Sequence, residues 1–237
     1  MDGILTLLSF GPDGWSDEIA RGVLVTVSLA LATLPFGLAA GFVIALGKIS
    51  EEPSLRLAAN IYTTIFRGLP ELLTLFLVFY GAQIAVQQIV RLFGVSAGIE
   101  INAFVAGMVA LGAVFSAYAS EVFVSAFRAI PAGQYEGAYA VGLSRWQTMR
   151  LVILPQLVRL ALPGLSNLWL ILLKETSLVS VIGLADILRQ TGVAARVSKE
   201  AFLFFGLACL LYLGLAVLSS FAFSAIERRV SASGPTR

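Results

Sequence analysis

The sequence contains no histidine and only one cysteine, Cys209, among its 237 residues. The absence of histidine removes the commonest general base and a common metal ligand. A single cysteine excludes a disulfide within the chain. We therefore expect neither a catalytic centre nor a metal or cofactor site to be built from this chain alone.

Charged residues are also scarce. They make up 13% of the sequence, whereas hydrophobic residues make up 58% and the mean hydropathy is +0.91. These values lie outside the range of ordinary soluble domains. The net charge of +2 is spread along the chain without a basic block, which argues against nucleic acid as a partner. We expect membrane lipid to surround most of the surface.

Long uncharged runs give the fold class. Several of them, including 22–47 and 201–226, approach or exceed the ~20 apolar residues that cross a bilayer as an α-helix. The sequence therefore predicts an all-α integral membrane protein that forms a single transmembrane domain over residues 1–237. The five expected spans are 22–47, 57–90, 103–127, 146–173 and 201–226.

Two of these spans carry residues that alter an ordinary helix. The second would be roughly 51 Å long at 1.5 Å per residue, which exceeds a hydrocarbon core of ~30 Å. Pro70 predicts a break within it, because proline donates no hydrogen bond and leaves the carbonyl of Phe66 without its helical partner. In the first span Gly37 and Gly41 lie four residues apart on one face, where another helix can approach closely.

The segment 131–145, between the third and fourth spans, predicts a short helix, a turn and a restart. Gly142 suits the left-handed conformation that ends a helix. Ser144 and Gln147 lie three apart, as the two partners of a capping box at the start of the next helix do. The preceding helix, 132–141, is rich in small residues that allow another protein to come close. From spacing alone it is equally well an ordinary loop helix.

The same segment carries a family resemblance. Glu136, Gly137 and Ala138, followed by Gly142, Leu143 and Ser144 and then by Leu154 and Pro155, resemble the EAA loop of ABC importer permeases. Gly137 replaces the first Ala of that pattern and Val152 the usual Ile, and both changes keep size and polarity. Further agreement with the polar amino acid branch of this family extends over 62–70, 163–167 and 174–180.

The resemblance implies a type I importer permease with a MetI-like core of five transmembrane helices. It also implies three partners: a second permease subunit, identical or related; a dimer of ATP-binding cassette subunits; and a periplasmic substrate-binding protein. The cytoplasmic coupling helix, with Glu136 to Ser144 and Pro155, would dock into the ATPase. The chain itself is not expected to be an enzyme, because its nearest approach to a phosphate loop, 41–49, has the wrong spacing and no Ser or Thr after Lys48.

A charge in the bilayer centre costs ~2.5–3.5 kcal/mol on insertion scales, so ionisable residues in the spans should face protein or a watery cavity. They are therefore candidates for the binding site of a polar solute. Arg67 and Glu71, four apart across Pro70, either neutralise each other or receive a solute beside the freed Phe66 carbonyl. The resemblance implies that the carboxylate in the position of Glu71 binds a basic amino acid. Weaker candidates for the same path are Asn167 and Ser177. Glu121 is expected to be structural and to hold a cation.

The distribution of Lys and Arg slightly favours an N-terminus on the periplasmic side and a C-terminus in the cytoplasm of a bacterial inner membrane. The expected cargo is a polar, basic amino acid or an opine, or another small polar solute. An exporter or secondary carrier would not need the segment from Glu136 to Pro155. A membrane enzyme would need a convergent catalytic set, which the lack of histidine disfavours.

Overall fold

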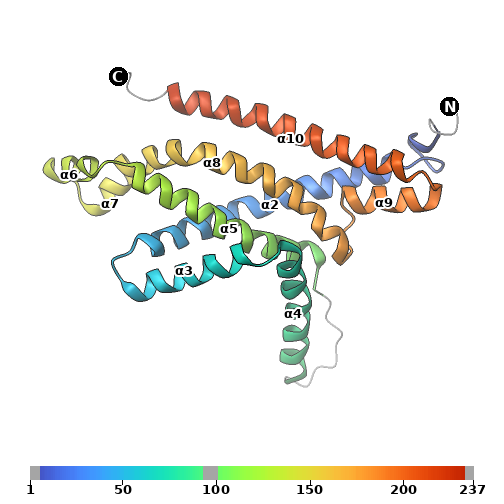
Figure 1. The fold of residues 1–237 in the computed structure, drawn as a ribbon, viewed down its shortest axis with the longest axis horizontal. Helices are drawn as coiled ribbons and strands as arrows, with labels where there is room; N and C mark the ends of the chain where they lie inside the picture. The colour runs from blue at the N-terminus through green and yellow to red at the C-terminus, as the bar shows by residue number, and fades with distance from the viewer. Residues whose placement is uncertain (1–5, 93–100, 233–237) are drawn as a thin grey trace.

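The computed structural model describes residues 6–92 and 101–232, which fold as helices joined by short connections (Figure 1). In chain order the elements are α2 (Ser16–Ile49), α3 (Pro53–Gly68), α4 (Glu71–Leu92), α5 (Ala103–Ala129), α6 (Ala132–Ala140), α7 (Arg145–Gln147), the π-helical turn η1 (Thr148–Ile153), α8 (Leu154–Glu175), the 3-10 helix η2 (Thr176–Ile182), α9 (Ile187–Ser198) and α10 (Ala201–Ala232). No strand occurs in these two ranges. The all-α prediction is confirmed.

Five stretches are long and apolar enough to cross a membrane, within the residues that the structure describes: Ser16–Ile49, Glu71–Val90, Ala103–Ala129, Arg145–Ile182 and Ala201–Val230. Each contains most of one expected span. The difference is largest for the second span, where the expected range 57–90 includes α3, which lies outside the crossing stretch. The fourth stretch extends beyond the expected range because η1 and η2 continue α8 at its two ends.

The core forms where α2 packs along α5, as the two glycines of α2 predicted. A Cβ atom added to Gly37 would lie 2.5 Å from the Phe115 ring, and one added to Gly41 would lie 2.9 Å from the Ser116 carbonyl oxygen and from Ala119. Both distances are too short for a real side chain, so the two backbones are close only because glycine occupies both positions. Leu29, Phe115 and Ala119 are buried along this seam.

Pro70 ends one helix and begins another. The N–H of Leu69 still bonds the Ile65 carbonyl at 3.0 Å, but Leu69 is extended and the next helix starts at Glu71. The second span is therefore two separate helices with a sharp change of direction between them. Figure 1 shows α4 running across the direction of the other long helices, with its N-terminal end beside α5.

The connector before the last span folds as η2 and α9. Asp186 caps α9, since its Oδ1 accepts the N–H of Arg189 at 2.9 Å, and its Oδ2 accepts the hydroxyl of Tyr212 on α10 at 3.3 Å. Thr26 on α2 accepts the N–H of Ile187 at 3.3 Å. Burial raises the pKa of the Asp186 carboxyl to about 6. The connector thus fastens α9 between α2 and α10.

Candidate functional site

Arg67, at the end of α3, reaches across to α5. Its Nη1 donates to Glu121 Oε1 at 2.6 Å, and its guanidinium carbon lies 5.6 Å from the centre of the Tyr118 ring. The expected alternative, a pair with Glu71 four residues on, is absent from the ion pairs of the described residues. Pro70 explains this, because a pair at that spacing needs one continuous helix and the helix stops between the two side chains.

Glu121 holds a second cation. The same Oε1 accepts Lys48 Nζ at 2.5 Å, and Lys48 also donates to Thr63 Oγ1 at 3.0 Å. The expectation that Glu121 binds a cation is confirmed, with two cations in place of one. One carboxylate thereby joins α2, α3 and α5 and fixes the helix that precedes the break at Pro70.

Glu71 begins α4, is partly buried, and has no ion pair among the described residues. It lies within electrostatic range of Glu175, the last residue of α8, and α4 contacts η2, which follows Glu175. The start of α4 therefore faces the junction of α8 and η2. With Phe66, Arg67 and Pro70 around the break, this end of the molecule brings two carboxylates from distant parts of the sequence into electrostatic range of each other.

The sequence reasoning passed over Glu175, although 174–180 was among the segments that resembled the family. Two adjacent ionisable residues, Lys174 and Glu175, stand at the end of an otherwise apolar span. Charges in such a position are costly and commonly functional. That rule alone would have selected Glu175. Its proximity to Glu71, by contrast, depends on the turn of the chain at Pro70.

The two weaker candidates face other hollows. Asn167 lines a cavity between α8 and α10 that also contains Glu227. Ser177 donates to the Lys174 carbonyl at 2.7 Å and lines a hollow near Tyr212 of α10. Neither hollow contains Glu71 or Arg67 among its lining residues. Phe66, Arg67, Pro70 and Glu71 lie together around the break between α3 and α4. Asn167 lines a different hollow, and Ser177 lies in η2, two residues after Glu175.

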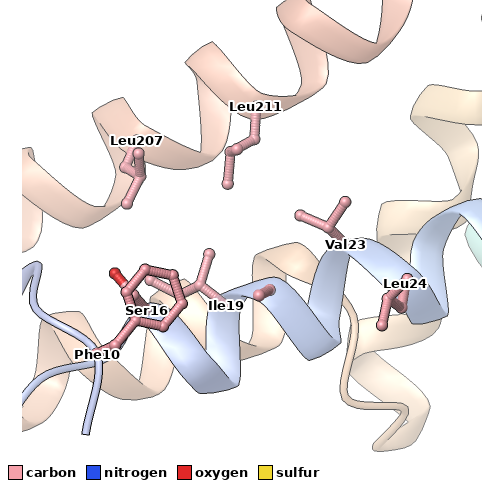
Figure 2. Close-up of a pocket in the computed structure, with 8 residues that line it drawn as sticks. Phe10, Ser16, Ile19, Val23, Leu24, Leu207 and Leu211 are labelled. Atoms are coloured by element: carbon pink, nitrogen blue, oxygen red, sulfur yellow. The ribbon is translucent and has the colours of Figure 1, made fainter.

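A third hollow lies between α2, α10 and the N-terminal segment (Figure 2). It measures about 480 Å³. Leu207 and Leu211 of α10 face Ile19 and Val23 of α2, and Ser16 supplies the single polar side chain among the lining residues. A surface of this kind offers a polar solute almost no hydrogen bonds. It suits contact with hydrocarbon.

The segment after α5 has the expected turn. Gly142 is left-handed, with φ +83°, and the N–H of Leu143 bonds back to the Ala138 carbonyl at 3.1 Å. Ser144 Oγ accepts the N–H of Gln147, and the Gln147 side chain accepts the N–H of Ser144 at 2.9 Å, which completes the capping box. Glu136 and Gly137 are exposed on α6, whereas Ala138 is buried. The predicted turn and cap are confirmed.

Helix α6 is attached to the base of α8. Gln156 Nε2 donates to Gln134 Oε1 of α6 at 3.0 Å and to the Val152 carbonyl in the π-helical turn at 2.8 Å. Tyr135 packs into the main core, and Pro155 lies in the first turn of α8, where its missing N–H costs least. The opposite surface is left open, because Tyr139, Val141 and Trp146 are all exposed. The segment thus has one face held by α8 and one aromatic, apolar face free for contact.

No metal site is apparent in the described ranges 6–92 and 101–232, which contain no group of three or more Cys, Asp or Glu side chains that could hold an ion. The ionisable side chains at the break are those of a binding site or a structural network. Nothing in their arrangement resembles a nucleophile with an adjacent base.

Comparisons with known proteins agree with this architecture. The chain is 42% identical over 225 residues to the nopaline transport system permease protein NocQ of Agrobacterium fabrum, which covers 94% of this chain and 95% of that protein. It is 38% identical over 219 residues to the histidine/lysine/arginine/ornithine transport system permease protein HisQ of Escherichia coli, with 92% and 95% covered.

Among solved structures, the crystal structure of an amino acid ABC transporter with histidines superimposes with a TM-score of 0.76 at 32% identity, covering 91% of this chain and 95% of that one. The inward-facing MetNI methionine ABC transporter shares the fold, with a TM-score of 0.73 at 21% identity. The MetI-like fold expected from the sequence is confirmed. Residues 17–232 match the family described as the binding-protein-dependent transport system inner membrane component, and the chain belongs to that family.

Proposed function

We propose that this chain is the transmembrane subunit of an ATP-driven importer that moves polar, basic amino acids or opines inward across the bacterial inner membrane. Support comes from the relatives described above, which are named for the transport of nopaline and of histidine, lysine, arginine and ornithine. The feature of this chain that carries the proposal is Glu71, a partly buried carboxylate at the break beside Pro70 that has no ion pair among the described residues and lies within electrostatic range of Glu175. Two carboxylates in the membrane attract a cationic group and repel an anionic one.

The neighbours of Glu71 suit this role. Arg67 is committed to Glu121, so it does not neutralise Glu71 by direct contact. Pro70 has no N–H to donate to the Phe66 carbonyl, so that carbonyl lacks its usual helical donor. We therefore place the ammonium or guanidinium group of the solute near Glu71 and Glu175. Asn167 and Ser177 line other hollows, and their part in the binding site stays a prediction.

The remaining parts of the proposal concern partners and orientation. The chain pairs with a second permease subunit, and a periplasmic binding protein delivers the solute. Glu136 to Ser144, with Pro155 behind them, contact a dimer of ATP-binding subunits on the cytoplasmic side. This orientation places the N-terminus in the periplasm and the C-terminus in the cytoplasm, as the distribution of Lys and Arg favours. ATP is hydrolysed by the partner subunits.

The test is uptake by the assembled transporter, reconstituted with its binding protein, from a panel that contains arginine, nopaline and the neutral amino acid glutamine. In Glu71→Gln and Glu175→Gln, uptake of arginine and nopaline, which both carry a guanidinium group, should fall about ten-fold relative to glutamine, because a charge-assisted hydrogen bond contributes ~1.5–3 kcal/mol. Glu51→Gln, at an exposed position in the loop after α2, is the matched control. Equal loss of every solute in the two variants, at normal protein levels, would contradict the proposed site.

A further inference from the structure

The cavity between α8 and α10 differs from the other hollows in its chemistry. It measures about 210 Å³ and is lined by Ser166, Asn167, Leu170, Ser220, Phe223, Ser224 and Glu227. Five of these seven side chains are polar. The other two hollows lie between apolar side chains for the most part, as Figure 2 shows for one of them. A polar hollow between two membrane-crossing helices calls for a polar occupant.

Most polar atoms that line this cavity are oxygens that can accept further hydrogen bonds. The single hydroxyl proton of Ser166 is shared between two acceptors, the Leu162 carbonyl at 2.8 Å and Glu227 Oε1 at 3.0 Å, and the second contact joins the two helices. In the described part of the chain, Glu227 takes part in no ion pair. The hydroxyls of Ser220 and Ser224 and the amide of Asn167 bring further oxygens to the same space. A carboxylate surrounded by hydroxyls and an amide oxygen is suited to a cation with several N–H donors.

The position of the cavity across the membrane limits which cation could occupy it. Helix α10 runs from Ala201 to Ala232, and at 1.5 Å per residue a hydrocarbon core of ~30 Å is crossed in about twenty residues. Counted from Ala201, the stretch from Ser220 to Glu227 therefore lies at the headgroup layer. Arg228 follows directly and is exposed, which places a positive charge beside the carboxylate. A zwitterionic headgroup has both of the complementary charges.

A bare metal ion fits the cavity poorly. Ca²⁺ takes six to eight oxygen ligands at close range, and Mg²⁺ requires a tight octahedron, whereas this space holds a single carboxylate in about 210 Å³. Drug-sized ligands occupy cavities of roughly 300–1,000 Å³. The volume here is that of a smaller group.

We infer that the cavity between α8 and α10 binds the primary ammonium headgroup of an aminophospholipid, of which phosphatidylethanolamine is the probe. Glu227 accepts one of the three N–H groups of the ammonium, and two of the three oxygens of Ser220, Ser224 and Asn167 accept the others. The acyl chains lie along the exposed apolar surface of α10. The trimethylated headgroup of phosphatidylcholine has the same charge but no N–H donor, so it is the natural control. The inference does not depend on the proposed cargo or direction of transport.

The test uses the intact transporter in nanodiscs that contain equal amounts of phosphatidylethanolamine and phosphatidylcholine, followed by extraction into mild detergent and native mass spectrometry of the lipids that remain bound. The wild-type protein should retain phosphatidylethanolamine about ten-fold over phosphatidylcholine, as expected for a charge-assisted hydrogen bond. Glu227→Gln should abolish that preference. The Gln side chain still accepts the Ser166 hydroxyl, so the tie between the helices is kept. Glu200→Gln, just before α10 at its other end, should leave the preference unchanged.

A second variant keeps the test decisive if Glu227→Gln does not assemble. Ser224→Leu fills the cavity and leaves the carboxylate in place, and it too should lose phosphatidylethanolamine while eluting as the intact complex. Equal retention of the two lipids by the wild-type protein, or an unchanged preference in both variants, would overturn the inference. A second result would also overturn the inference: the wild-type protein binds radiolabelled lysine and Glu227→Gln does not, while the retained lipid is the same in both. The cavity would then bind the ammonium group of a solute. Dissociation of the second permease subunit from Glu227→Gln with lipid retention unchanged would assign the cavity to a subunit contact.

Discussion

Glu121 receives Lys48 and Arg67 on the same oxygen, and the two cations differ in burial, so mutation can separate their contributions. The Lys48 side chain is 12% exposed and that of Arg67 is 43% exposed, while Glu121 itself is 33% exposed. A hydrogen bond to a charged group contributes ~1.5–3 kcal/mol, whereas an exposed ion pair contributes ~0.2–1 kcal/mol. We expect a coupling energy of ~2 kcal/mol between Lys48 and Glu121 and of less than ~1 kcal/mol between Arg67 and Glu121.

The assay is a pair of double-mutant cycles on the free energy of unfolding of the permease in bicelles, built from Lys48→Met, Arg67→Met and Glu121→Gln. Glu121→Gln alone should be the most damaging single change, because it leaves a nearly buried ammonium without its counter-charge. The Lys48→Met, Glu121→Gln double variant should be less unstable than the sum of its parts. A coupling energy for Arg67 equal to or above that for Lys48 would refute this account of the network.

Three further predictions follow from the packing and the caps. Gly41→Val should destabilise the fold by ~1–3 kcal/mol, since its side chain would meet the Ser116 carbonyl of α5; Gly81→Val, where nothing lies within 4 Å, is the control in thermal unfolding. Gln156→Leu should separate ATP hydrolysis from uptake by freeing α6 from α8, and a normal ratio of solute moved to ATP hydrolysed would argue against that link. Because burial raises the pKa of Asp186 to about 6, the folded protein binds this proton more tightly than the unfolded chain between pH 4 and 6. The contribution to stability therefore falls as pH rises through that window, by at most about 3 kcal/mol. Asp186→Asn, which keeps the cap, should remove that part of the pH dependence, as a comparison of unfolding midpoints at pH 4.5 and 7.5 will show.

The spans and the turn at Gly142 were predictable because they depend on local rules. A bilayer fixes the length of an apolar run, and the pair Ser144 and Gln147 satisfies its own backbone within four residues. The close approach at Gly37 and Gly41 was predictable for the same reason, since a helix face lacking side chains has few other uses.

The partners of the charges were not predictable. Arg67 lies four residues from Glu71, which favours a local pair, yet the break at Pro70 turns it toward Glu121 on α5. Glu71 is instead near Glu175, which lies far along the chain. Helix α9 was missed because it is too short and too polar to look like a span, and its helical start depends on Asp186, which Tyr212 reaches from α10. Long-range contacts of this kind are set by the tertiary fold.

The position of α4 has a consequence for the life of the protein in the cell. Only 11% of its apolar stretch is buried within the chain, and it runs across the other long helices (Figure 1). A helix held by so few contacts of its own subunit opens at little cost in free energy, and the rate of proteolysis rises with the population of the opened state. We expect the newly made chain to be short-lived until other subunits cover α4. Degradation of the excess, and not synthesis alone, would then set how many copies accumulate.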